Sequence, residues 1–353
     1  MRLSLGSPLL FVIALGCAKD APVEGLPGAQ DGPVQEQVDE AAPAPDAALA
    51  PAAEPAGSSL LSPDQQALVA RIRVEGNVLT LIDAGAEPRQ ALVVTAGAGH
   101  TERVRFGMDM TMAMSMGAMG MNEARMPTII SDMVMEVLEV TPEDHLVVST
   151  ETVSVTLDAS DPSIDPMLAQ QLEGSLEGMV GMRVLSTMDR LGHTLDTEME
   201  LPEGMDPAMR DQIDSMSNSL SQVTALYPSE PVGPGARWDT AMLVENQGMS
   251  LLQIVSYQLD ALEAHTATLS YEYEQVLVGM STMEGLPPGA GVEFSSFESG
   301  GHGQSVHELT DLTPQQVHAD LAMDFLMRIT VQDMTQDMRT TMDIGLDLNH
   351  VEE

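Results

Sequence analysis

Apolar side chains alternate with small or polar ones between residues 104 and 116. The apolar positions fall on every second residue: Val104, Phe106, Met108, Met110, Met112, Met114 and Met116. Successive side chains of a strand point to opposite faces of a sheet, so this spacing gathers the apolar set on one face. The pattern predicts a half-buried strand of an antiparallel sheet, in which methionine serves as a flexible apolar filler of the core.

The same alternation returns near the C-terminal end. Apolar residues occupy odd positions from 321 to 331 and then even positions over much of 334–348. The phase changes between Val331 and Met334, which predicts a turn or a β-bulge at this point. Further strands are predicted at 152–157, 182–188, 193–201 and 267–278, with a hairpin turn at "DRLG" (189–192).

Two segments have helical spacing instead. Apolar residues recur every three or four positions in 166–182 and in 205–226, and a proline stands near the start of each segment. Pro228 and Pro231 prevent the second helix from continuing. The predicted fold class is α+β, mainly β: a large curved antiparallel sheet of long strands with two central helices packed on one side. The pattern leaves open whether helices fill the concave side or leave it hollow.

The first residues predict export. Arg2 precedes an apolar run from Leu9 to Leu15, which is far shorter than the roughly 20 residues that span a bilayer. Residues 1–16 are therefore predicted to be a signal peptide. The following "ALGC" resembles the bacterial lipobox, with alanine where leucine is usual. This resemblance implies that Cys17 is acylated and anchors the chain in a lipid bilayer.

The next segment is predicted to be a tether. Residues 17–60 are rich in alanine, proline, glycine and acids and have no periodic apolar positions, a composition typical of disorder. Residues 61–353 form a single β-rich domain in this interpretation. Ala18 follows the cysteine, and resemblance to enterobacterial sorting then implies the outer membrane, facing the periplasm or the cell surface.

Charge narrows the choice of partners. The chain has 14 basic and 54 acidic residues, a net charge of −40. Nucleic-acid binding needs basic groups that neutralise phosphates, so nucleic acid is not an expected partner. Aromatic residues make up only 3% of the chain, which also disfavours sites built on stacked rings. The expected partners are the lipid bilayer, through acylated Cys17, and an apolar ligand or an envelope protein.

Candidate chemistry is sparse. His302, His307 and His318 lie at spacings that match no zinc signature, and "ESGGHGQSVHELTD" (298–311) is predicted to be a glycine-loosened loop leading into a strand. His302 and His307 are weak candidates for a metal site, and the methionines could serve a soft ion such as Cu(I). The acidic stretch "DASDPSIDP" (158–166) is predicted to be a loop that caps the next helix. No catalytic residue and no cofactor are predicted.

Several stretches together resemble a family of uncharacterised bacterial exported proteins, many of them lipoproteins, catalogued as a domain of unknown function. The stretches are "GAEPRQALVV" (85–94), the methionine-rich strand, "YPSEPVGPGARW" (227–238), "GGHGQSVHELTDL" (300–312) and "LAMDFLMRITV" (321–331). The resemblance covers roughly residues 85–350. It implies an exported, β-rich protein and brings no catalytic residues with it. Locally, the prolines and glycines of 227–238 predict a tight linker into a new strand that Trp238 anchors.

The sequence thus predicts a membrane-anchored, exported bacterial lipoprotein of the cell envelope. It is expected to be non-enzymatic, with a structural or binding role and an apolar ligand as one possibility. One alternative is a methionine-rich lipoprotein that handles copper or another metal. The other is a hydrolase whose carboxylates the sequence does not identify.

Overall fold

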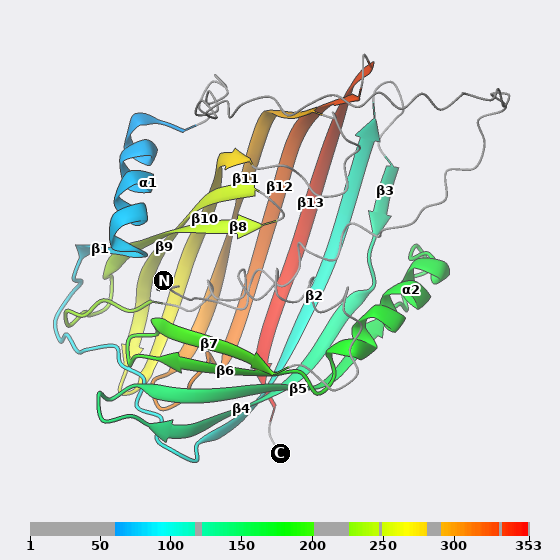
Figure 1. Cartoon of the computed structure of the whole chain (residues 1–353). Helices are drawn as coiled ribbons and strands as arrows, with labels where there is room; N and C mark the ends of the chain where they lie inside the picture. Colours follow the sequence, from blue (N-terminus) through cyan, green and yellow to red (C-terminus); the bar gives the residue numbers. More distant parts are fainter. Residues whose placement is uncertain are drawn as a thin grey trace, which may run out of the picture.

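The computed structural model describes residues 61–116, 122–200, 226–246, 249–280, 291–331 and 334–351. The predicted signal peptide, Cys17 and the predicted tether lie outside the described residues, and so does the predicted helix over 205–226 apart from its last residue, Leu226. Within the described part the chain is α+β and mainly β (Figure 1).

The elements follow one another along the chain without a break between domains. In order they are α1 (Pro63–Glu75), β1 (Val78–Asp83), β2 (Thr101–Met116), β3 (Asn122–Arg125), β4 (Thr128–Val140), β5 (Leu146–Asp158), α2 (Pro166–Leu176), the 3₁₀ turn η3 (Glu177–Met179), β6 (Arg183–Met188), β7 (Thr194–Glu200), β8 (Arg237–Asn246), β9 (Met249–Glu263), β10 (Thr266–Met280), β11 (Gly291–Glu308), β12 (Gln316–Val331) and β13 (Met334–His350).

The described strands form one antiparallel sheet of 13 strands. Its order is β1-β8-β9-β10-β11-β12-β13-β2-β4-β5-β6-β7, with β3 paired to β2. The predicted strands are confirmed, and so is the reversal near the C-terminal end, where Val331 pairs with Met334. Several strands reach 15 to 18 residues, far beyond the usual length of about 5–6.

The sheet bends back on itself. Strand β2 pairs with β13 over Val104–Met116 but with β4 only over Thr101–Met108. The register shifts between Asp132 and Met133, which marks a bulge where β4 runs beside β5. Strands β4 to β7 therefore leave the plane of the long strands and cross in front of their lower part (Figure 1).

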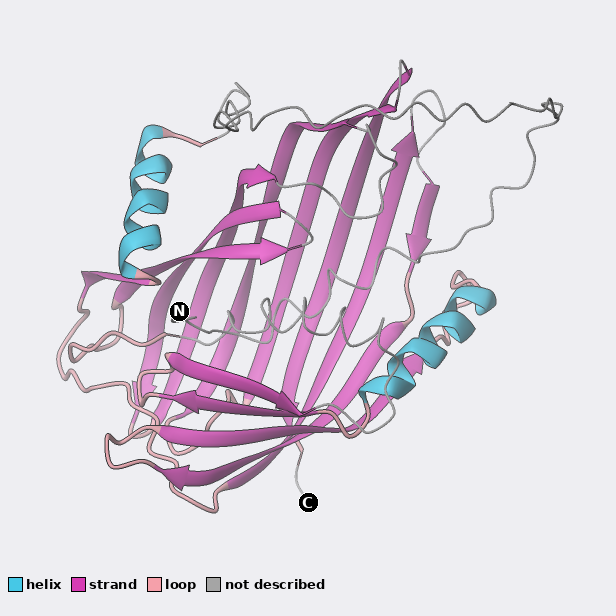
Figure 2. Ribbon diagram, viewed as in Figure 1, coloured by secondary structure: helices cyan, strands magenta, loops and turns pink. Residues whose placement is uncertain are grey.

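The two helices lie at opposite sides of the sheet (Figure 2). Helix α2 confirms the prediction for 166–182 and packs against β5. Helix α1 was not predicted. It begins with a capping box, in which Ser62 accepts from the Gln65 backbone N–H while the Gln65 side chain accepts from the Ser62 N–H. Val69 and Ile72 of α1 are buried against β1 and β8.

The prediction of a glycine-loosened loop at 298–311 is wrong. This stretch belongs to β11, which pairs with β10 and β12 through the glycines. A Cβ on Gly303 would lie 2.5 Å from the Tyr271 ring, and one on Gly301 would lie 2.6 Å from the Leu321 side chain. The glycines make room for neighbouring side chains to lie over the strand, so they serve packing and do not interrupt it.

A candidate apolar-ligand cavity

The concave face of the bent sheet encloses a cavity of about 350 Å³. Small-molecule sites commonly have volumes of roughly 300–1,000 Å³. One wall comes from β2, β4, β5 and β6, and the other comes from β8 to β13, with the end of α2 at the side. The aliphatic part of the lining includes Val94, Val104, Ile129, Val148, Val155, Leu176, Val184, Val255, Leu309, Leu312, Val317, Leu346 and Leu348.

Methionine supplies much of the remaining lining, from both walls: Met108, Met133, Met135, Met179, Met182, Met188 and Met242. In β2, Met108 and Met110 are buried, and their direct partners across β13 are Leu346 and Ile344. The predicted core role is confirmed for these two residues, whereas Met112 and Met114 are half-buried. Thioether side chains are flexible and can adapt to an irregular apolar surface.

A band of aromatic rings crosses the inner face of β8 to β10. Tyr257 stacks on the fully buried Trp238, with ring centroids 5.5 Å apart, and Tyr271 lies 5.8 Å beyond Tyr257. Tyr257 and Tyr271 line the cavity. Burial raises the pKa of Tyr271 to about 12 and holds the pKa of Tyr257 above its usual range. Both hydroxyls are therefore neutral at physiological pH.

A buried hydrogen-bonded chain joins the two ends of this wall. His307 Nδ1 lies 2.6 Å from the Tyr227 hydroxyl, and His307 Nε2 lies 2.8 Å from Ser305 Oγ. All three residues are buried and all three line the cavity. Burial lowers the pKa of His307 to about 4, so the ring is neutral near pH 7.

The structure separates the two histidines proposed as weak metal ligands. His302 and His307 point to opposite faces of β11, as residues five apart on a strand must. The His302 side chain is 76% exposed and lies 3.8 Å from Asp320, whereas His307 is buried in the cavity wall. They do not share a site. His318 lies on the outer face and contacts Asp347, whose hydrogen bond raises the pKa of His318.

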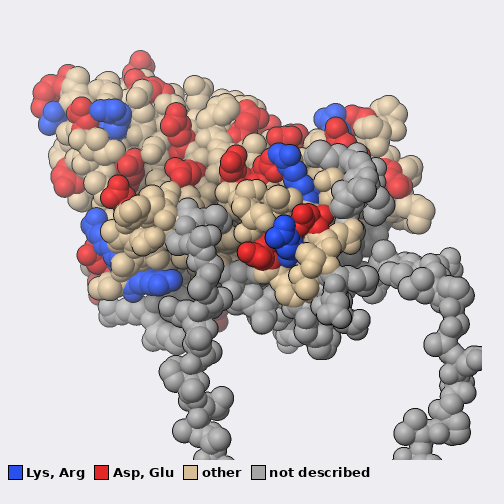
Figure 3. Space-filling model, turned by 90° about the horizontal axis from the view of Figure 1, so that it is seen from above, with Lys and Arg blue, Asp and Glu red and all other residues tan. Residues whose placement is uncertain are grey.

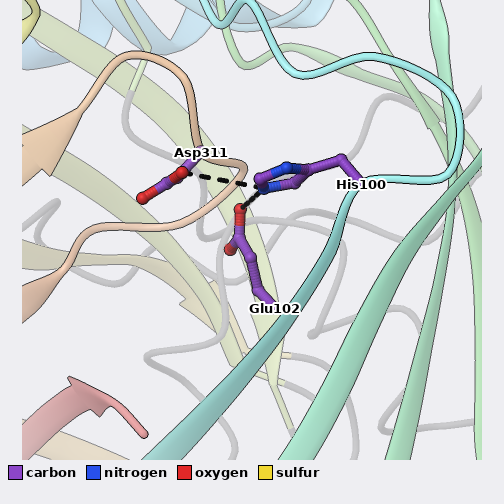
Figure 4. Close-up of side chains that lie close together, drawn as sticks. All are labelled: His100, Glu102 and Asp311. Atoms are coloured by element: carbon purple, nitrogen blue, oxygen red, sulfur yellow. Dashed lines mark hydrogen bonds and ion pairs between the residues drawn. The ribbon is translucent and has the colours of Figure 1, made fainter. Parts of the chain in front are cut away.

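A second polar cluster lies where β2 begins (Figure 4). His100 Nε2 lies 2.7 Å from Glu102 Oε1 and 3.7 Å from Asp311 Oδ1. The buried Glu102 carboxylate also accepts from the backbone N–H of Leu312 and from the N–H and hydroxyl of Thr313. Both oxygens of Glu102 thus already have protein donors. The cluster ties the turn after β11 to β2 and resembles a structural clamp more than a vacant cation site.

Two further sequence motifs have local structural roles. The side chain of Asp165 accepts from the Met167 N–H at the start of α2, so the predicted helix-capping loop is confirmed. In the segment 227–238, Trp238 is fully buried and its Nε1–H donates to the Leu226 carbonyl. A Cβ on Gly233 would lie 1.8 Å from the Ala86 carbonyl oxygen, so glycine is required for this close approach of two loops.

Sequence reasoning did not identify the Ser305–His307–Tyr227 chain. Ser305 and His307 share the phase of Leu309 in "SVHEL", so alternation places them on one face. Tyr227 is 80 residues distant from His307 in the chain, and only the fold brings it there.

No family model matches the chain, and no curated protein matches it. In the part of the chain that the structure describes, no helix has both the length and the apolar character needed to cross a bilayer. Acidic side chains are spread over the visible face, with few basic ones among them (Figure 3).

Proposed function

We propose that the chain is an exported lipoprotein of the cell envelope that holds an apolar ligand in its concave cavity and does not transform it. The observation that carries the proposal is the cavity itself, an apolar space of about 350 Å³ between two walls of one sheet. Protein interiors are usually packed to the density of organic crystals, with few voids larger than a water molecule. A space of this size with an apolar lining favours an occupant.

The character of the lining supports a binding role. Burying apolar ligand surface contributes roughly 25 cal/mol per Å², and this cavity offers such surface on both sides. Methionines line both walls, among them Met108, Met133 and Met242. Flexible methionine-rich surfaces re-pack around ligands of different shape. We therefore expect tolerance of chain length and branching in the ligand.

The expected address supports the same role. A lipid anchor at Cys17 followed by a tether of about 40 residues would hold the domain near a membrane, where apolar molecules are concentrated. Soluble carriers in such a place must shield their ligand from water, and a hollow sheet face can do so. The strongly acidic surface suits a domain that stays solvated beside the bilayer.

The copper-handling alternative has weaker support. Thioethers that bind a soft ion must converge on one point. The buried Met108 and Met110 instead pack among Phe106, Ile344 and Leu346, as apolar filler does. The hydrolase alternative still lacks a nominated pair of carboxylates.

Mass spectrometry of the purified chain tests the ligand. Ser186 lines the cavity, and Thr187 is the next residue on the same strand and lies outside the lining. We expect the wild type and Thr187→Phe to carry a co-purifying apolar molecule, and Ser186→Phe to carry much less of it. Equal loading of all three proteins, or no apolar molecule in any of them, would contradict the proposal.

Replacement of Cys17 tests the address separately. We expect the wild-type chain to fractionate with membranes and to incorporate a labelled fatty acid. Cys17→Ser should do neither, while its purified domain still binds ligand. Membrane association that survives the Cys17→Ser change would contradict the lipid anchor.

A further inference from the structure

The Ser305–His307–Tyr227 chain places a hydrogen-bond donor at the cavity wall. The neutral ring of His307 has one N–H and one bare nitrogen, and its two nitrogens contact the Tyr227 and Ser305 hydroxyls. The three groups together carry three polar hydrogens: one on Ser305, one on His307 and one on Tyr227. The two hydrogen bonds of the chain use two of them.

One hydroxyl hydrogen is therefore left over, at one end of the chain or the other. If Tyr227 donates to Nδ1, then Nε2–H donates to Ser305 and the Ser305 hydrogen remains. In the opposite tautomer, the Tyr227 hydrogen remains. Among the described residues, neither hydroxyl has a further acceptor within hydrogen-bond distance. Both residues line the cavity, so an acceptor atom on a ligand can take up the remaining hydrogen.

The charge of the lining selects against an anion. The charged residues that line the cavity within the described part of the chain are Glu308, Asp311 and Asp347, all of them acidic. A carboxylate or phosphate inside the cavity would find no lysine or arginine among these lining residues. Burying an unpaired charge is costly, whereas an ester or ketone oxygen needs only one donor.

We infer that the cavity selects an uncharged, apolar molecule with a carbonyl oxygen, such as the ester of an acylglycerol, and hydrogen-bonds that oxygen through Ser305 or Tyr227. This inference rests on the proposed function, because it names the class of ligand for the same cavity. A free fatty acid has the same apolar chain but an ionised head, and an alkane has neither charge nor acceptor. The three classes can therefore be compared directly.

The single tryptophan provides the readout. Trp238 is separated from the cavity only by Tyr257, on which it stacks, and bromine atoms on a bound chain quench tryptophan fluorescence at short range. The probes are dibromostearoyl glycerol, dibromostearate and dibromooctadecane, which share one brominated chain. They are titrated into delipidated full-length protein with Cys17→Ser at a pH near 8.

We expect dibromostearoyl glycerol to bind about tenfold more tightly than dibromooctadecane, the factor expected for one net hydrogen bond. Dibromostearate should bind more weakly than dibromostearoyl glycerol. One of the variants Ser305→Ala and Tyr227→Phe should abolish the preference for the ester while leaving dibromooctadecane binding unchanged. Binding of the alkane also shows that a variant has kept its cavity.

Two results would overturn the inference while leaving the proposed function intact: dibromostearate binding as tightly as the glycerol ester, or both variants keeping the wild-type preference for the ester over the alkane. If none of the three probes quenches Trp238 in the wild type, the proposed function itself fails. If a variant does not fold, the comparison of the three probes on the wild-type protein still decides the class of ligand.

Discussion

Burial of His307 makes the stability of the domain depend on pH in a defined window. The pKa of His307 falls from 6.5 to about 4 because burial disfavours the charged ring. As the pH drops below about 6.5, the unfolded chain binds a proton at this histidine and the folded chain does not. The free energy of unfolding attributable to His307 is complete above about pH 6.5 and is lost as the pH falls toward 4. It does not change further below that value.

The size of the effect follows from the shift. A difference of about 2.5 pKa units corresponds to about 3 kcal/mol, because one unit is worth about 1.4 kcal/mol. In His307→Gln the side chain cannot titrate, although its amide can still donate and accept hydrogen bonds. We expect the wild type to be more stable than this variant at pH 7. The difference should shrink by about 2–3 kcal/mol on going to about pH 4.5.

Urea unfolding of both proteins at several pH values measures this difference. Comparing the two proteins cancels the titration of the many carboxylates that they share. His318→Gln is a matched control, because its ring is exposed and its folded pKa is raised by Asp347. The contribution of His318 should have the opposite sign: it is present at low pH and lost as the pH rises through the raised pKa. A constant gap between wild type and His307→Gln from pH 7 to 4.5 would refute the reasoning.

Three further changes test other parts of the fold by urea unfolding. Glu102→Gln should cost about 2–4 kcal/mol, because buried N–H groups of the following turn lose their charged acceptor; a loss below about 0.5 kcal/mol would contradict the clamp. Gly303→Ala should cost about 1–3 kcal/mol through the clash with Tyr271, while Gly279→Ala, with open space around its Cα, should cost less; equal costs would argue against the packing role. In Asp132→Asn, the stabilising ion pair with Arg105, which lowers the pKa of Asp132, is lost. This variant should be less stable than the wild type at pH 7, with a gap that closes as the pH falls below about 4, and a gap that persists at acid pH would contradict the assignment.

The strands could be predicted because alternation is a local signal. Met108 and Met110 fall on one face of β2 whatever that strand pairs with, so their burial followed from the sequence. The same holds for Trp238, whose linker of prolines and glycines predicted an anchored strand start. Helix α2 was also recognisable from its apolar spacing and Pro166.

Other features depend on contacts between distant parts of the chain. Alternation shows which side chains share a face, but the bend of the sheet depends on β2 pairing with β13 on one side and with β4 on the other. The cavity follows from that bend. Helix α1 has a weak apolar stripe, and its capping box was the signal that could have located it. The glycines of β11 were misread because the ring that covers Gly303 comes from another strand.

Methyl NMR of methionine-labelled protein tests most directly whether the concave face holds the ligand. The resonances of Met108, Met133 and Met242 report on the cavity, because these residues line it from both walls. Met327 is buried in β12 outside the lining, and Met167 is 79% exposed on α2. Addition of an acylglycerol should shift the three cavity resonances and leave those of Met327 and Met167 in place. Shifts confined to Met327 and Met167, or no shift at saturating ligand, would contradict a hollow sheet face that binds apolar molecules.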